Sequence, residues 1–97
     1  MRYDIVFAPE AVADFKRLNA HARSEVKEAI ERHLRHQPSK TSRSRIKRLR
    51  GLSRPQYRLR VGGIRVFYDI SSSSVEVLAI VEKSQAQSWL EQAGEQR

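Results

Sequence analysis

Three arginines stand at positions where a β-hairpin would bring them together. Arg58 and Arg60 alternate with apolar residues in segment 57–61, and Arg65 follows a Gly-Gly pair in segment 64–70. Because side chains alternate between the faces of a strand, Arg58 and Arg60 share one face, and a tight turn places Arg65 beside them. Guanidinium groups match phosphate oxygens bidentately. The spacing therefore predicts a phosphate-binding surface on one face of a sheet.

Two further residues of this hairpin bear on the same face. Phe67 shares the strand side of Arg65, where an exposed ring could stack on an unpaired base. Asp69 is the only carboxylate within the hairpin, so it cannot neutralise three guanidinium groups. A nucleic-acid backbone is the expected counter-charge. The alternative is that the arginines only keep an exposed sheet soluble.

A basic segment surrounds the hairpin. From Arg32 to Tyr68 the chain carries twelve Lys or Arg residues and no Asp or Glu, whereas the whole chain has 19 basic and 11 acidic residues and a net charge of +8. So concentrated a charge is typical of a polyanion-binding surface, and its alternative is a solvated basic loop. The residues before the hairpin that are expected to contact phosphates are Arg43, Arg45, Lys47, Arg48, Arg50 and Arg54.

The length and composition are those of one small domain. Ninety-seven residues fit a single domain, 1–97, with a thin hydrophobic core. The absence of cysteine excludes disulfides and thiolate metal sites and favours the reducing cytoplasm. Since no apolar run is long enough to be a signal peptide or a membrane span, a soluble cytoplasmic protein is expected. No ligand spacing links the histidines, so no metal site is expected at His21, His33 or His36.

Hydrophobic periodicity predicts an α+β fold. The expected strands are 3–7, 57–61, 64–70 and 75–81, with 46–52 as a weak candidate. A first helix begins at Pro9, Asn19 is expected to cap a second helix over 21–36, and Ser84 with Gln87 forms a capping-box pattern before a short C-terminal helix. We therefore expect a twisted antiparallel sheet of three to four strands, with a two-helix hairpin packed on one face.

Two stretches of this chain resemble a known family. They are Arg48-Leu49-Arg50-Gly51-Leu52 and the run Tyr57-Arg58-Leu59-Arg60-Val61-Gly62-Gly63-Ile64-Arg65-Val66-Phe67-Tyr68. Both are similar to the core signature of the RelE/ParE superfamily, the toxins of bacterial type II toxin–antitoxin pairs. The chain length, the early Ala8-Pro9-Glu10-Ala11 helix start and the element order agree with that resemblance, which implies a RelE-like fold.

The resemblance implies a chemistry for several residues. RelE-type members sit in the ribosomal A site and cut messenger RNA without a metal or other cofactor, by attack of a 2′-hydroxyl on the adjacent phosphate. By position, Arg58 and Arg60 match the basic pair of the strand, and Arg65 matches the phosphate-holding arginine. Lys83 matches a residue that stabilises the transition state, and Trp89 falls where many members have a functional tyrosine. The basic segment before the hairpin would then bind RNA.

Some residue types depart from the RelE pattern. Arg58 and Arg60 stand where RelE-like enzymes have lysine, and arginine is a poor base because its pKa lies above about 12. Trp89 can stack on a base but cannot transfer a proton, and it could instead dock the final helix on the core. Glu82, the only carboxylate beside the expected site, could act as the base or simply pair with a neighbouring cation. Catalysis would then rest on substrate positioning and electrostatics, with the ribosome supplying geometry.

Three functions therefore stand open at the level of sequence. The first is a ribosome-dependent mRNA endoribonuclease that inhibits translation. The second is a ParE-like inhibitor of DNA gyrase, and the third is a catalytically weak toxin that acts with its antitoxin as a transcriptional autorepressor. Each implies a cognate acidic antitoxin of the RelB type, whose disordered tail would wrap the toxin. The first adds the ribosome and messenger RNA as partners; operator DNA would be contacted only through the antitoxin complex, and no membrane partner is expected.

Overall fold

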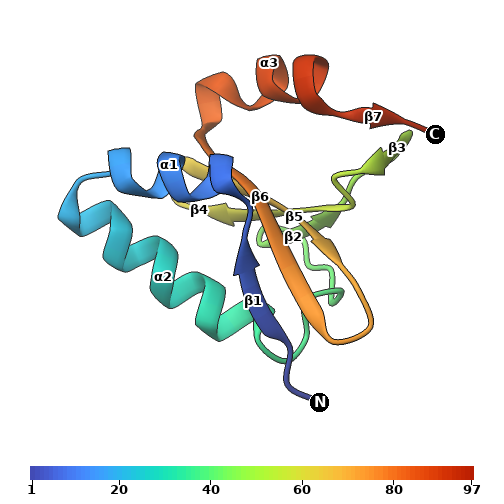
Figure 1. Cartoon of the computed structure of the whole chain (residues 1–97), viewed down its shortest axis with the longest axis horizontal. Coiled ribbons are helices and arrows are strands. Elements are labelled where there is room, and N and C mark those ends of the chain that lie inside the picture. Colours follow the sequence, from blue (N-terminus) through green and yellow to red (C-terminus); the bar gives the residue numbers. More distant parts are fainter.

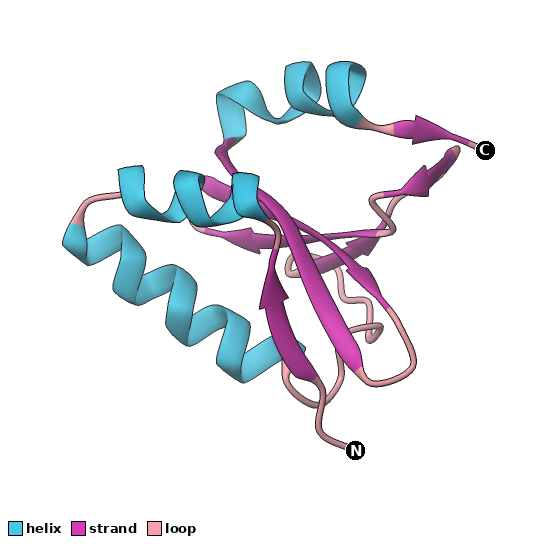
Figure 2. Cartoon of the chain, viewed as in Figure 1, coloured by secondary structure: helices cyan, strands magenta, loops and turns pink.

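The computed structural model describes residues 1–97, and three helices surround a twisted five-stranded sheet (Figure 1; Figure 2). The helices are α1 (Pro9–Arg17), α2 (Ala20–Leu34) and α3 (Lys83–Ala93). The strands of the main sheet are β1 (Asp4–Phe7), β2 (Ile46–Arg48), β4 (Tyr57–Val61), β5 (Ile64–Ile70) and β6 (Ser74–Glu82). A separate two-stranded sheet joins β3 (Leu52–Arg54) to β7 (Glu95–Gln96). None of the helices has the length and apolar character needed to cross a membrane.

The main sheet has the strand order β1-β6-β5-β4-β2 and is mixed. Alternation predicted β4 and β5 with the bounds that the structure has, and they pair as an antiparallel hairpin. β1 runs parallel to β6, with Asp4 opposite Ser74. The α+β prediction is confirmed, and so is the antiparallel sheet of three to four strands, because β2, β4, β5 and β6 pair antiparallel. The parallel addition of β1, which makes the whole sheet mixed, was not predicted. Two short edge strands, β1 and β2, complete the sheet. Nothing in the sequence of either strand indicates which strand it pairs with.

The α1–α2 pair covers one face of the sheet, as the sequence predicted (Figure 1). Asn19 caps α2, since its side-chain oxygen accepts a hydrogen bond of 2.8 Å from the N–H of Ala22. The core between helices and sheet is made of fully or nearly fully buried side chains: Ala11, Val26, Ala29, Ile30, Leu34, Ile46, Leu59, Val61, Val66, Tyr68, Val75, Val77 and Ile80. On β4 and β5 these residues occupy the alternate positions, so the arginines between them are left for the opposite face.

Asp14 links α1 to the part of β6 that extends beyond its pairing with β1. β1 ends at Phe7, opposite Val77, so Ile80 has no strand partner on that side of β6. The carboxylate of Asp14 is buried and accepts a hydrogen bond of 2.9 Å from the N–H of Ile80. A buried N–H needs an acceptor, and here a side chain replaces the missing strand.

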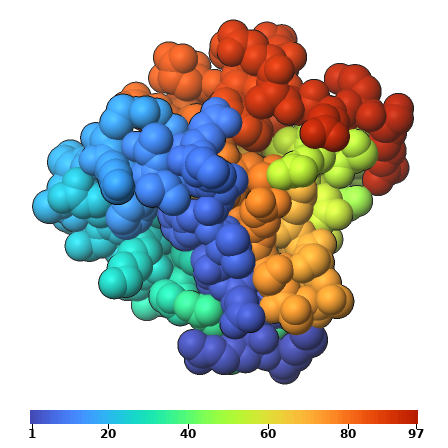
Figure 3. Space-filling model, in the orientation of Figure 1, coloured from blue at the N-terminus to red at the C-terminus, as the bar shows by residue number.

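The C-terminal helix lies across the other face of the sheet. β6 continues to Glu82, which pairs with Ile64, and the N–H of Lys83 donates to the carbonyl of Gly63 at 2.8 Å. The helix starts directly after this strand, with Glu82 at the N-cap position and no side-chain cap. The capping box predicted at Ser84 was therefore wrong, because Ser84 already lies inside the helix. In Figure 3 the last residues lie at the surface beside β3.

Candidate nucleic-acid interface

Four basic side chains lie on the sheet face opposite the α1–α2 pair. Cross-strand pairing places Lys47 opposite Arg58 and Arg60 opposite Arg65, so the register gathers two pairs of cations on three adjacent strands. Paired residues of an antiparallel ladder share one face. We call Lys47, Arg58, Arg60 and Arg65 the cationic face. Its three arginines are those that the sequence predicted to lie together.

Arg65 is the most enclosed member of this face, with only 7% of its surface exposed. Its guanidinium donates hydrogen bonds to the carbonyls of Gly62 and Ile64, at 2.9 and 3.1 Å. Burial lowers the pKa of Arg65, and the neighbouring charges of Arg58 and Arg60 lower it further. Arg65 still stays charged, so the repulsion from Arg58 and Arg60 adds to the cost of burying its guanidinium on this face.

No carboxylate pairs with the cationic face. None of its four side chains takes part in an ion pair, and Asp69 is bound to Arg54 instead. The Nε atom of Arg58 is buried and has no hydrogen-bond partner. An unsatisfied buried donor among uncompensated cations is rare in folded proteins, and an anionic oxygen would satisfy both the donor and the charge.

Phe67 does not offer an open stacking platform. It pairs with Arg58 across the hairpin but is completely buried, because the indole of Trp89 on α3 stacks on its ring at 4.9 Å between centroids and 13° between planes. The expectation that Phe67 stacks on an RNA base does not fit this arrangement. Trp89 adopts the docking role that was its alternative, and its Nε1 also donates to Glu10 on α1 at 3.3 Å.

Glu82 and Lys83 lie at the edge of the site. Glu82 pairs with Ile64, whose side chain packs on the core, so the register places Glu82 on the helix-pair side of the sheet, away from the cationic face. It forms no ion pair. This position does not favour Glu82 as a base for chemistry at the arginines. Lys83 is exposed at the first position of α3.

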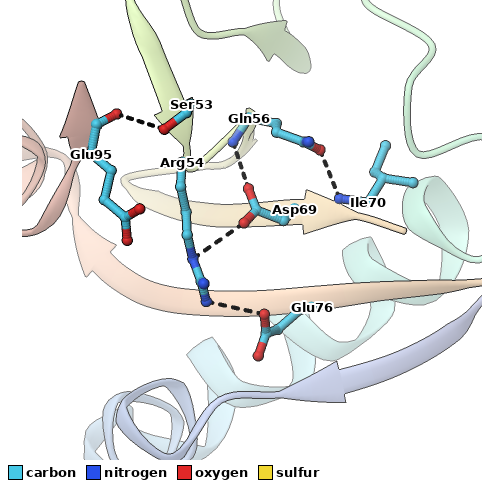
Figure 4. A network of polar contacts seen from close by, with 7 residues as sticks. All are labelled: Ser53, Arg54, Gln56, Asp69, Ile70, Glu76 and Glu95. Atoms are coloured by element: carbon cyan, nitrogen blue, oxygen red, sulfur yellow. Dashed lines mark hydrogen bonds and ion pairs between the residues drawn. The ribbon is translucent and has the colours of Figure 1, made fainter. Parts of the chain in front are cut away.

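Two of the expected RNA contacts are engaged within the protein. The guanidinium of Arg48 lies 5.0 Å from the centre of the Tyr57 ring, a cation–π contact on the core side of the sheet. Arg54 bridges Asp69 and Glu76 at 3.3 and 3.1 Å (Figure 4). Both arginines therefore serve the protein's own packing, which the sequence could not indicate because their partners come from other strands.

A network of polar contacts around Asp69 explains why this carboxylate does not neutralise the cationic face. Asp69 accepts a hydrogen bond of 2.8 Å from the N–H of Gln56, and the Gln56 side chain accepts from Ile70 at 2.9 Å (Figure 4). Burial raises the pKa of Asp69 against the opposing effects of the Gln56 N–H and of Arg54, and the nearby Glu76 and Glu95 raise it further. The network holds the segment before β4 against β5 and β6.

A groove borders the cationic face. It lies between the β2–β3 connection and α3, has a volume of about 710 Å³, and includes Lys47 and Arg50 among its lining residues. Gln87 and Glu91 line its α3 wall, and sequence reasoning missed both because nothing local places α3 opposite this loop. The remaining expected contacts, Arg43 and Arg45, are exposed in the loop before β2.

The element order, the helix pair on one sheet face and the cationic hairpin on the other define a RelE-like toxin fold. The family model described as "ParE toxin of type II toxin-antitoxin system, parDE" matches residues 5–87, so the chain belongs to this family of toxins. The resemblance to the RelE/ParE superfamily is thereby confirmed. Comparison with curated protein sequences found no significant match.

Solved toxin structures share the fold. A chain of the RelE-RelB complex from Pyrococcus horikoshii is 19% identical, with 88% of this chain and 99% of that chain covered and a TM-score of 0.71. A chain of the RelB-RelE complex from Methanococcus jannaschii is 23% identical, with 87% and 96% covered and a TM-score of 0.67. The isolated E. coli RelE toxin is 19% identical, with 91% and 98% covered and a TM-score of 0.65. At these identities the likeness concerns the fold.

Proposed function

We propose that this type II toxin is a ribosome-dependent endoribonuclease that cleaves messenger RNA in the cytoplasm and so inhibits translation. The observation that carries the proposal is the cationic face, where four basic side chains lack any carboxylate partner and the buried Nε of Arg58 lacks a hydrogen-bond acceptor. A phosphodiester fits this face because its oxygens accept forked hydrogen bonds from guanidinium groups.

The proposed reaction is attack of a ribose 2′-oxygen on the adjacent phosphorus. The new 2′-O–P bond forms as the bond from phosphorus to the 5′-oxygen breaks, the 2′-hydroxyl loses its proton and the leaving oxygen gains one. Charge builds up on the phosphate oxygens in the transition state, and Arg58, Arg60 and Arg65 are placed to stabilise it. Lys47 is the one residue of the cationic face other than arginine, so its amine is the group there most suited to proton transfer.

A second function is favoured by two observations. The matching family model is that of ParE toxins, and the cationic face carries no histidine, tyrosine or carboxylate for proton transfer. A ParE-like toxin that binds DNA gyrase, without catalysis of its own, would need no group for proton transfer. The same arginines would then hold a polyanionic or acidic partner rather than a scissile phosphate.

An acidic antitoxin of the RelB type is part of the proposal. Several structural neighbours were solved as complexes of a RelE toxin with a RelB antitoxin. The net charge of +8 favours an acidic partner by charge complementarity. Contact with operator DNA would be made only by the toxin–antitoxin complex.

Induction of the toxin in cells, followed by mapping of messenger RNA 5′ ends, separates these functions. We expect new ends at positions set by the reading frame. Arg60→Gln changes an exposed side chain and should fold normally, and loss of one stabilising cation should reduce cleavage about 100-fold or more. Arg2→Gln, an exposed arginine outside the basic segment, is the matched control and should cleave like the wild type.

One outcome would contradict the proposed site, and another would contradict the nuclease proposal itself. Unchanged cleavage in the variant with Lys47, Arg58, Arg60 and Arg65 all replaced, with the fold verified by circular dichroism, would place the chemistry elsewhere. Intact transcripts combined with accumulation of gyrase-linked DNA breaks would favour the gyrase function instead.

A further inference from the structure

A second basic hollow lies on the helix-pair side of the molecule, around the C-terminal end of α2 and the loop that leads to β2. It has a volume of about 450 Å³, within the range of small-ligand sites. We call it the α2 pocket, and its ionisable lining residues are Arg32, His33, His36, Lys40 and Arg45.

No carboxylate lines the α2 pocket. Arg32 is paired with Glu28 at 3.1 Å, outside the pocket, whereas Lys40 and Arg45 take part in no ion pair. Arg45 is held in place by its loop, because its N–H donates to the Ser42 hydroxyl at 3.0 Å. The pocket therefore presents two uncompensated cations, one of them anchored at its backbone, beside two histidines. This outweighs the partial negative charge at the end of α2.

His33 reports the same excess of positive charge. Burial lowers the pKa of His33, and the charges of Arg45 and Arg32 lower it further. Two carboxylates, those of Glu25 and Glu28, line the adjacent hollow that His33 also borders. An anion bound in the α2 pocket would offset the charges of Arg45 and Arg32 and so raise the pKa of His33. A change in the titration of His33 can therefore report binding.

The α2 pocket adjoins the cationic face around the β2 edge of the sheet. The N–H of Arg60 donates to the carbonyl of Arg45 at 2.8 Å, so the backbone of a cationic-face residue and that of a pocket residue are directly joined. Arg45 lines the pocket, while Arg60 belongs to the opposite face. A strand of nucleic acid that crosses the cationic face and turns around this short edge strand would reach the pocket next.

We infer that the α2 pocket is a second phosphate-binding site, which holds the backbone of the RNA strand that lies on the cationic face. The identity of the ligand as RNA rests on the proposed function, whereas the affinity for phosphate rests on the pocket alone. Two anchored phosphate sites on either side of the sheet edge would fix the direction of the strand as well as bind it.

The first test needs only inorganic phosphate. The ring resonances of His33 and His36 are followed by NMR while phosphate is added to the purified protein, with equal ionic strength of chloride as the reference. We expect phosphate to shift both rings and to raise the pKa of His33, and the double variant K40Q/R45Q to lose both effects. Identical responses to phosphate and chloride would overturn the inference; weak shifts that K40Q/R45Q retains would mean an adventitious ion only and would overturn it as well.

The second test measures a single-stranded oligoribonucleotide at several salt concentrations. Since the slope of log K against log salt is about −0.7 per phosphate for single strands, each lost contact weakens binding about fivefold at 0.1 M salt. K40Q/R45Q should lose about one contact or more and flatten the slope accordingly. K16Q/K27Q removes the same charge from exposed positions of α1 and α2 and is the control. An equal loss in the control would reduce the effect to long-range attraction and refute the site.

The two proposals fail separately. Pocket-dependent RNA binding by a protein that leaves transcripts intact would keep the α2 pocket and count against the nuclease. Cleavage that K40Q/R45Q leaves unchanged in rate and in position, with unchanged RNA affinity, would keep the nuclease and remove the pocket.

Discussion

An aromatic stack helps to attach α3 to the sheet, and truncation of Trp89 should loosen the helix. No side chain of α3 is fully buried. The helix is held by the stack of Trp89 on Phe67, by the hydrogen bond of Trp89 to Glu10 and by the pairing of β7 with β3. Truncation of a fully buried Trp to Ala lowers the free energy of unfolding by about 3–5 kcal/mol. Because Trp89 is only half-buried, its truncation should destabilise the folded state by about 2 kcal/mol.

Native-state hydrogen exchange is the assay for Trp89→Ala. Because a loss of about 1.4 kcal/mol changes an equilibrium tenfold, amides of α3 should exchange about 30-fold faster in the variant. The stack is absent from the helix-open state and from the unfolded state alike, so the free energy of global unfolding should also fall by about 2 kcal/mol and the urea midpoint should drop. Because α3 can open without the sheet, its amides should exchange faster than those of β5 in the wild type and in the variant. Trp89→Phe keeps the stack but removes the N–H donor to Glu10, so it should change α3 exchange less than about threefold.

One result would refute this reasoning about α3. If amides of α3 exchange as slowly as those of β5 in the wild type, the helix and the sheet unfold as one unit, and the stack supports the whole fold. If the local opening is confirmed, α3 can move away from Phe67, next to Arg58, at a small cost in free energy.

Asp14→Ala should lower the free energy of unfolding by about 1–3 kcal/mol in chemical denaturation, because the buried N–H of Ile80 loses its acceptor; Asp14→Asn, whose amide oxygen can still accept, should lose much less, and equal losses would contradict the role of this bond. Tyr68→Phe should cost about 1–2 kcal/mol, since the buried Tyr68 hydroxyl donates to the Pro38 carbonyl at 2.6 Å; an unchanged urea midpoint would rule that out. Burial raises the pKa of Asp69 above its ordinary 3.8, so the carboxyl group binds its proton more tightly in the folded than in the unfolded state. The contribution of Asp69 to stability therefore falls as pH rises from 3.8 through the raised pKa. The wild type measured against Asp69→Asn should show that fall in denaturation curves at several acidic pH values, and a difference that rises with pH would refute it.

The local parts of the fold were predictable from sequence. Strict alternation gave the bounds of β4 and β5 and the shared face of Arg58 and Arg60, because the period of a strand depends only on neighbouring residues. Asn19 was predictable as a helix cap for the same reason. The long-range parts were not. The parallel pairing of β1 has no signal in its own four residues, since its partner is at the other end of the chain.

The same limit applies to the site. Composition alone could not separate arginines that are free from those with a partner: Arg48 meets Tyr57, and Arg54 meets Asp69 and Glu76 only after folding. The position of Lys47 on the cationic face was equally hidden, because Lys47 and Arg48 themselves interrupt the apolar pattern of β2.

The pairing of β1 with β6 has a consequence for how the toxin is made. The β4–β5 hairpin closes through two glycines, whereas β1 must wait for a partner strand near the end of the chain, with Asp4 opposite Ser74. Closing so long a loop is entropically costly and slows folding. During translation, α1 and α2 leave the ribosome well before the strand on which β1 and Asp14 depend. The toxin should therefore stay unfolded until β6 has left the ribosome.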